Sequence, residues 1–136
     1  MEPKGAKMII KGILNPQINS LISRVRHTNT LVIADRGFPF WPEIETIDIS
    51  LVDGIPTVCQ VLEALRPNFM IGKAFMAEEF RKGNSPEVQK RFSSILQGVT
   101  VDFEPHVDFK KRVPFAIGLI RTADTTQYAN IIIESA

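Results

Sequence analysis

Short runs of β-branched and apolar residues alternate with segments of helical periodicity along most of this chain, and no other feature constrains its fold as much. The expected strands are Thr30–Ala34, Glu45–Leu51, Phe69–Ala77 with an interruption at Gly72-Lys73, Thr100–Phe103, Ala116–Arg121 and Ala129–Ile133. The expected helices are one that follows Asn15-Pro16, then Thr57–Leu65, then Ser85–Leu96 and finally Pro105–Val113. Strands that alternate with helices favour a parallel sheet with helices packed on it. We therefore predict an α/β fold, with a central, largely parallel sheet and helices on both faces.

The length of the chain predicts one domain. With 136 residues it is long enough to bury a full hydrophobic core, and it contains no internal repeat or linker. We assign residues 11–136 to this single domain. The N-terminal residues 1–10 begin with a polar stretch, and Met8 offers an alternative start, so we expect a leader or tag-like segment there, without function.

Charge and cysteine content exclude several classes of protein. The 16 Lys and Arg residues are scattered and are nearly balanced by 15 Asp and Glu residues, which argues against a nucleic-acid partner. No apolar run reaches the roughly 18 residues that span a bilayer, so no membrane segment is expected. The single cysteine, Cys59, excludes an internal disulfide and fits a reducing compartment. We expect a cytoplasmic protein.

The common motifs of cofactor chemistry are also missing from the sequence. There is no Gly-x-Gly-x-x-Gly fingerprint, P-loop, His-Glu-x-x-His or Gly-x-Ser-x-Gly. His27 and His106 are the only two histidines, and few carboxylates stand near them in the pattern that a metal site needs. We therefore expect neither a cofactor nor a metal ion.

Residues suited to a ligand site stand next to strand ends. In open α/β sheets, ligands bind outside the carboxyl ends of the strands. Asp35 and His106 each follow an expected strand, and the segment Tyr128-Ala129-Asn130 enters the last one with a phenol, backbone groups and an amide that suit sugar hydroxyls. His27 instead precedes the first strand. A strand of about five residues at ~3.3 Å each would place it at the opposite end from Asp35.

Each of these residues also has an ordinary structural interpretation. His27 suits a surface or capping position between a helix and a strand, and Asp35 suits a turn. His106 stands where a neighbour of a helix cap is expected. Tyr128 and Asn130 suit a turn and a sheet edge. Taken one by one, the residues do not decide between these interpretations and a binding site.

In combination, the chain resembles the D-ribose pyranase and fucose mutarotase family, with the ribose pyranases most similar. The resemblance extends from Lys11 to Ile133 and comprises an ordered series of motifs. They are Lys11-Gly12-Ile13-Leu14-Asn15, Arg26 to Asp35 with Gly37 and Pro39, Ile47 to Leu51 with Gly54 and Pro56, Ala77-Glu78-Glu79-Phe80, His106 to Lys110, Ile120-Arg121-Thr122 and Tyr128-Ala129-Asn130-Ile131.

This resemblance implies an isomerase that interconverts the pyranose and furanose forms, or the anomers, of a monosaccharide such as D-ribose. It implies that His27 is the proton donor and that Asp35, His106 and the segment Tyr128, Ala129 and Asn130 bind the sugar. It also implies ring-shaped homo-oligomers, expected to be decamers, with sites built between neighbouring subunits. Because a histidine both gives and takes protons near neutral pH, this chemistry needs no cofactor.

Several residues depart from the family's usual pattern. Arg26 replaces glycine, Asn29 stands where aspartate is frequent, and Arg36 replaces a small residue next to the expected site aspartate. Ala123-Asp124 replaces a Gly-Glu pair, and the sequence reaches Ala136 without the usual Gly-Val and aromatic tail. With two added arginines expected near the pocket, the sugar could differ from ribose, for example a fucose-like, phosphorylated or acidic one.

Two other functions fit the same sequence. The first is a sugar-binding accessory protein of a transport or utilisation operon that binds without turnover, if the added arginines have disabled catalysis. The second is a flavodoxin-like nucleotide-binding or signalling domain, which the alternation of elements alone suggests. The aromatic segment Phe38-Pro39-Phe40-Trp41-Pro42 suits a subunit contact better than stacking on a sugar.

Overall fold

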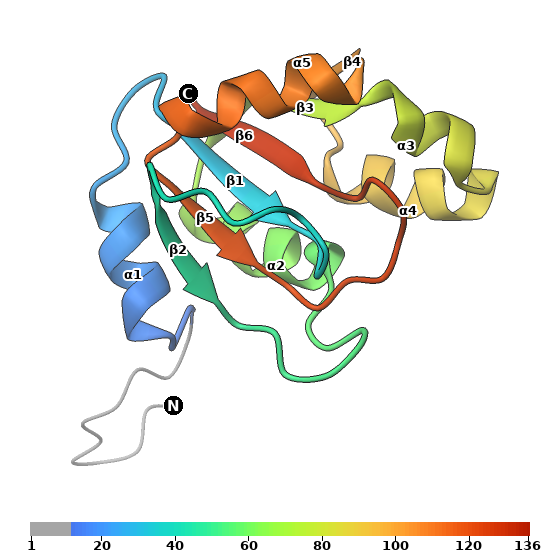
Figure 1. Ribbon diagram of the computed structural model, residues 1–136. Coiled ribbons are helices and arrows are strands. Elements are labelled where there is room, and N and C mark those ends of the chain that lie inside the picture. Colours follow the sequence, from blue (N-terminus) through green and yellow to red (C-terminus); the bar gives the residue numbers. More distant parts are fainter. Residues whose placement is uncertain (1–11) are drawn as a thin grey trace, which may run out of the picture.

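The protein forms a six-stranded sheet in a computed structural model that describes residues 12–136 (Figure 1). The predicted leader, residues 1–10, lies outside this range. The elements, in chain order, are α1 (Pro16–Ser23), β1 (Thr30–Ala34), β2 (Glu45–Asp48), α2 (Val58–Leu65), β3 (Ile71–Ala77), α3 (Glu78–Gly83), α4 (Pro86–Ile95), β4 (Thr100–Glu104), α5 (His106–Arg112), β5 (Gly118–Arg121) and β6 (Ile131–Ser135), with 3₁₀ turns at Arg66–Asn68 and Val113–Phe115.

The strand order is β2-β5-β1-β6-β3-β4. The pairs β1–β5, β2–β5 and β3–β4 are parallel, whereas β6 is antiparallel to both β1 and β3. Every strand except β6 therefore runs in one direction, which confirms the predicted largely parallel sheet. The expected interruption at Gly72-Lys73 is a shift of register between Ile71 and Lys73 against β6.

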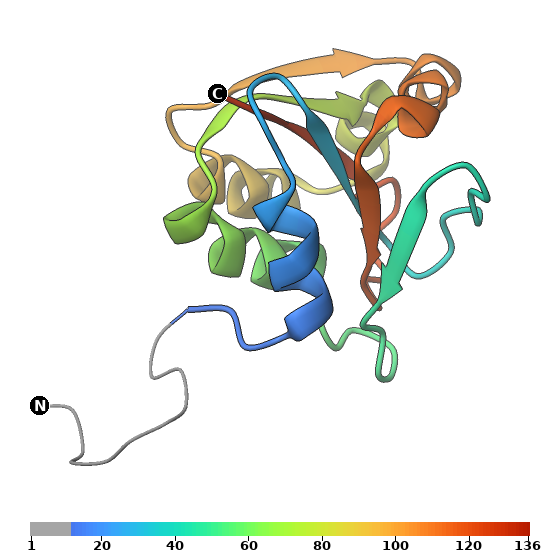
Figure 2. The ribbon, with the colours of Figure 1, turned by 90° about the vertical axis from the view of Figure 1, so that its left-hand side faces the viewer.

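Helices cover both faces of the sheet, as predicted (Figure 2). On one face, α1, α2, α3 and α4 contribute Leu21, Leu62, Phe80 and Phe92 to a core that also contains Ile33 of β1. On the other face, α5 and the loop after β1 cover a smaller core. Its buried residues are Val32, Ala34, Phe38, Phe75, Phe109, Val113, Ala116, Leu119 and Ile132. The central strands are buried from both sides, which explains why their residues are apolar almost without interruption.

Local capping signals set the starts of the three longer helices. The side chain of Asn15 accepts a hydrogen bond from the Ile18 amide at 2.9 Å, ahead of α1. Thr57 forms a reciprocal capping box with Gln60 at the start of α2. Ser85 caps α4, and Pro86 fills its first turn. Because such signals act within three or four residues, the sequence predicted these helices closely.

The structure differs from the predicted elements at several strand ends and in one additional helix. β3 begins at Ile71 rather than Phe69, and β5 begins at Gly118 rather than Ala116. β2 ends at Asp48 rather than Leu51, because the Asp48 carboxylate accepts the Ser50 amide at 2.9 Å and turns the chain. The last strand begins at Ile131 rather than Ala129. The helix α3 was not predicted. It follows β3 directly. Its cap residue, Ala77, has no side chain that could form a capping hydrogen bond, so the sequence carries no capping signal for this helix.

Candidate active site

A pocket of about 310 Å³ opens at the edge of the sheet where the parallel strands end. Its lining residues are Asp35, Arg36, Gly37, Phe38, Pro39, His106, Asp124, Thr125, Thr126, Gln127, Tyr128 and Asn130. They come from the loop after β1, the start of α5 and the loop before β6. Because β6 is antiparallel, its first residues meet the last residues of β1 at this edge, which brings three distant segments together.

Asp35 and Asn130 are hydrogen-bonded to each other in both directions. The Asp35 amide donates to Asn130 Oδ1 at 2.7 Å, and Asn130 Nδ2 donates to Asp35 Oδ2 at 3.3 Å. The other carboxylate oxygen of Asp35 accepts the Gly37 amide at 3.0 Å. Burial raises the pKa of Asp35, although these donors act in the opposite direction. The pair thus fixes one carboxylate, oriented and partly desolvated, in the pocket.

His106 is the first residue of α5, and its imidazole lies among aromatic rings. The ring is edge-on to Tyr128 at 5.1 Å and stacked near Phe109 at 5.9 Å between centroids, with Phe38 at 6.2 Å. Burial and Lys110 lower the pKa of His106, and Glu79 and Asp35 raise it, with a net lowering. A lowered pKa favours the neutral imidazole, in which one nitrogen can donate a hydrogen bond and the other can accept one.

Asp124 fixes the loop before β6, which is the third segment of the pocket. The sequence analysis identified this residue only as a departure from the family pattern. Its side chain, 4% exposed, accepts the Val58 amide at the start of α2 at 2.9 Å and the Thr126 amide at 2.8 Å. The loop that leads to Tyr128 is thereby tied to a helix. Tyr128 itself has a φ of +53°, a left-handed conformation that is costly for a residue with a side chain. An aspartate two residues before a threonine is typical of a turn that is closed by the aspartate side chain. This spacing was the sequence signal from which the role of Asp124 could have been predicted.

Of Ala129 and the two added arginines, one residue lines the pocket and two do not. Ala129 is fully buried and does not line the pocket. Arg36 does line it, with its guanidinium paired to Asp53 at 2.8 Å, and both side chains are more than half exposed. Arg26 lies elsewhere, since its guanidinium donates to the carbonyls of Ser23 and Val25. Within one chain, Arg36 is therefore the one of the two added arginines that lies at the pocket, because Arg26 precedes β1 and Arg36 follows it.

His27 also precedes β1 and is exposed at the opposite edge of the sheet from the pocket. The five residues of β1 separate the two edges by roughly 17 Å. The sequence predicted this separation from Asp35. Within a single chain, the structure therefore brings Asp35, His106, Tyr128 and Asn130 together and leaves His27 apart.

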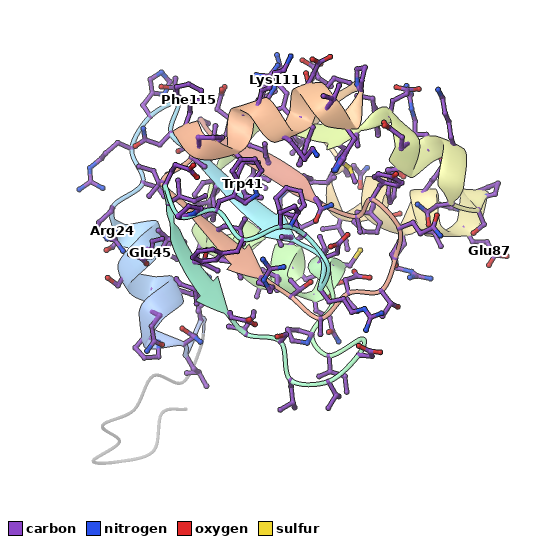
Figure 3. All side chains as sticks on the ribbon, viewed as in Figure 1. Arg24, Trp41, Glu45, Glu87, Lys111 and Phe115 are labelled. Carbon is purple, nitrogen blue, oxygen red and sulfur yellow. The ribbon has the colours of Figure 1, made fainter. Side chains whose placement is uncertain are left out.

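Trp41 does not line the pocket. Its indole packs beside Phe38, with ring centroids 6.2 Å apart, on the face that α5 covers (Figure 3). Phe40, next to it, is 70% exposed. The prediction that this segment contacts another subunit stays a prediction, and the geometry of one chain gives no support to sugar stacking by Trp41.

Within residues 12–136, no helix is long and apolar enough to cross a bilayer. In the same range, no three His, Cys, Asp or Glu side chains are grouped in a way that suits a metal ion.

Comparison with known proteins identifies the family. The sequence profile of the RbsD / FucU transport protein family matches residues 8–136. The chain belongs to this family. Among its curated relatives, the D-ribose pyranase of Geobacillus kaustophilus (strain HTA426) is 41% identical over 124 residues, which are 91% of this chain and 90% of the relative. The D-ribose pyranase of Chromobacterium violaceum is 38% identical over 125 residues, 91% of this chain and 94% of the relative.

Two solved structures illustrate the shared fold. Bacillus subtilis RbsD complexed with D-ribose matches with a TM-score of 0.88 and 29% identity over 95% of this chain and 98% of that chain. The fucose mutarotase of Streptococcus pneumoniae in complex with L-fucose matches with a TM-score of 0.77 and 18% identity, over 90% of this chain and 92% of that chain. The second likeness concerns the fold alone.

These relationships confirm the resemblance that the sequence motifs predicted, together with the single-sheet α/β fold. The curated relatives also confirm the predicted class of protein, an isomerase-type enzyme that interconverts sugar ring forms.

Proposed function

We propose that this protein interconverts the pyranose and furanose forms, or the anomers, of a monosaccharide such as D-ribose. One observation carries the proposal: the pocket at the carboxyl edge combines an oriented carboxylate, a neutral imidazole and a phenol, and it lies in a fold shared with a D-ribose complex at a TM-score of 0.88. A sugar presents hydroxyl groups that both donate and accept hydrogen bonds. The pocket offers partners of both kinds.

Ring opening needs two proton transfers at the hemiacetal. One group removes the proton of the anomeric hydroxyl, and another protonates the ring oxygen as the bond from the anomeric carbon breaks. General acid-base help of about 10²- to 10⁴-fold is enough for a reaction that also proceeds unaided in water. In our proposal, Asp35, His106, Tyr128 and Asn130 hold the hydroxyls, His27 protonates the ring oxygen, and water accepts the proton of the anomeric hydroxyl.

His27 reaches the pocket only if a second copy supplies it. The amino edge that carries His27 also exposes Phe115 (86%) and Met70 (78%), which precede β5 and β3. The carboxyl edge exposes Phe40 (70%) and Val107 (59%) near the pocket. Exposed large apolar side chains at both edges favour burial against a partner. Figure 3 shows Phe115 at the corner of the molecule near the start of β1.

The two edges are different surfaces of one chain, so their contact is head-to-tail. Head-to-tail contacts generate rings when the rotation closes. We therefore propose a ring in which each subunit inserts His27 into the pocket of the next, and we keep the decamer as the expected assembly. We also propose a cytoplasmic location, which the single, buried Cys59 supports.

Subunit complementation tests this arrangement. Chains with His27→Ala are co-expressed with chains with Asp35→Ala, and the mixed assemblies are purified through two different tags. Neither variant alone should exchange ribose forms in NMR saturation transfer. The mixture should regain activity in about a quarter of its sites, where an intact pocket meets an intact imidazole across a head-to-tail contact.

The matched control is a co-expressed pair of two tagged His27→Ala chains, which should stay inactive. Undiminished exchange in His27→Ala alone would remove His27 from the mechanism. A mixture no more active than its parents would contradict the shared site.

The second candidate is binding without turnover, which one observation favours: the pocket is assembled within one chain, whereas His27 is outside it. D-ribose that binds in a titration, with no acceleration of exchange in the assembled wild-type protein, would select this alternative over the isomerase.

A further inference from the structure

The short helix α3 and the residue that follows it, Asn84, contribute nothing to the pocket lining, and yet together they contact two of the three segments that build the pocket. The first three residues of α3 belong to the motif Ala77-Glu78-Glu79-Phe80, to which the proposed mechanism assigns no role. Its two carboxylates are directed differently. Glu78 forms an ion pair with Arg81 of its own helix, at 2.7 Å, whereas Glu79 reaches α5.

Glu79 supplies the acceptor that the start of α5 lacks. The cap residue of α5, Pro105, has no side chain that could accept a hydrogen bond. The amide of His106 donates instead to Glu79 Oε1 at 3.0 Å and Oε2 at 3.3 Å. A negative charge at the first turn of a helix is also favourable for the exposed amides there. Glu79 thus holds the backbone of the residue whose imidazole lines the pocket.

Asn84, the residue that follows α3, holds the opposite segment. Its Nδ2 donates to the carbonyl of Phe80 at 2.9 Å and to the carbonyl of Gln127 at 2.8 Å. Gln127 immediately precedes Tyr128, whose φ of +53° must be maintained by its surroundings. The carbonyl of Asn84 accepts Gln89 Nε2 of α4 at 3.0 Å, so this anchor is itself fixed.

We propose that Glu79 and Asn84 are positioning residues that set the edge-on contact between His106 and Tyr128 from outside the pocket. Without Glu79, the first turn of α5 loses the acceptor that another segment supplies to the His106 amide. Without Asn84, the loop before β6 loses the bond next to its strained residue. Either change moves one ring of the pair relative to the other, and sugar binding weakens as a result.

The test uses the full-length protein with Glu79→Ala, Glu79→Gln, Asn84→Ala and the control Glu78→Gln. NMR readouts are unambiguous because the chain has only two histidines and one tyrosine. We measure the nuclear Overhauser effect between the rings of His106 and Tyr128, the titration of His106, and the KM and kcat of ribose exchange.

Glu79→Ala and Asn84→Ala should weaken the contact between the rings and raise KM by about 10- to 100-fold, with a smaller change in kcat, as expected for misplaced binding groups. Glu79→Gln keeps an oxygen for the His106 amide, so it should keep the ring contact and a KM close to the wild-type value. It should still shift the titration of His106 to lower pH, because the Glu79 charge raises that pKa against the effects of burial and Lys110. Asp35, the other acidic group that faces His106, is unchanged. Glu78→Gln should match the wild type in all three readouts.

An unchanged ring contact and an unchanged KM in both alanine variants would overturn the inference. Loss of stability alone, with normal KM and kcat, would also overturn it, since it would mean a merely structural role. If Glu79→Ala does not fold, Asn84→Ala and Glu79→Gln still test whether the contact between His106 and Tyr128 depends on these two residues. The inference rests on the proposed function only for KM and kcat. A protein that exchanges no sugar refutes the function, whereas the ring contact and the titration still test the positioning.

Discussion

The two ends of strand β1 carry the two parts of the proposed site, and they are built in different ways. At the carboxyl end, Asp35 is held by Asn130 and Gly37, and the neighbouring loop is tied to α2 by the buried Asp124. At the amino end, His27 is exposed in a loop that backbone bonds attach to the last strand, such as that from Thr28 to Ser135 at 3.1 Å. The carboxyl end is organised within one chain. In the proposed assembly, the amino end becomes part of a site through contact with another copy.

The largest effect that tests this comparison is the loss of catalysis without loss of stability. His27→Ala should slow ribose exchange by about 10²- to 10⁴-fold, the usual contribution of general acid-base catalysis. Because His27 is exposed within its own chain and fills no part of that chain's core, the free energy of unfolding of the chain should stay within ~0.5 kcal/mol of the wild type. Saturation-transfer NMR and urea denaturation measure the two quantities. If His27→Ala lost stability as well as exchange activity, His27 would have a structural role rather than a catalytic one.

The next effect separates a buried carboxylate from an exposed one near the same pocket. Asp124→Ala leaves the Val58 and Thr126 amides without their acceptor, at a cost of about 1–3 kcal/mol. Asp53→Ala breaks only the exposed pair with Arg36, and its effect should stay below ~1 kcal/mol. Urea denaturation of both variants checks the difference. Equal losses would contradict the role assigned to Asp124.

A third effect appears only as a dependence on pH. Burial raises the pKa of Asp35, so its protonated form favours folding below the unfolded pKa near 3.8, and this contribution is lost as pH rises through the folded value. Asp35→Asn removes the titration. The stability of the variant relative to the wild type should therefore increase from pH 3 to pH 7. Denaturation curves across this range measure it, and a trend of opposite sign would mean that hydrogen bonding outweighs burial.

The smallest effect compares two strained residues, one at each end of the site. Thr28 has a φ of +66° and Tyr128 a φ of +53°. Thr28→Gly should stabilise the protein by up to ~1 kcal/mol, because it relieves the strain in an exposed loop. Tyr128→Gly should give no such gain, because the contact with His106 is lost as well. Thermal unfolding measures the stability of both variants. Equal gains in stability would mean that the contact between Tyr128 and His106 contributes nothing to the stability of the fold.

Much of the fold could be predicted because its signals are local. The capping residues Asn15, Thr57 and Ser85 indicate the helices that follow them, and runs of β-branched residues indicate the central strands. The general preference for ligands at the carboxyl ends of strands also placed Asp35 and His106 correctly at the pocket.

Other features had no local signal. The helix α3 begins without a capping side chain, and its Glu79 acts on an amide 27 positions further along the chain. Asp124 caps a helix 66 positions before it. Sequence spacing carries no information about such pairs until the order of the strands is known.

The sequence by itself determined which segments form strands and helices, and it supplied the motifs that identify the family. These properties depend on residue preferences and periodicity within a few positions. Only the tertiary structure decided that β6 runs antiparallel between β1 and β3, that Asn130 therefore meets Asp35, and that His27 stands at the far edge. The physical reason is that backbone pairing between distant strands sets these contacts, and every strand can form such bonds with many others.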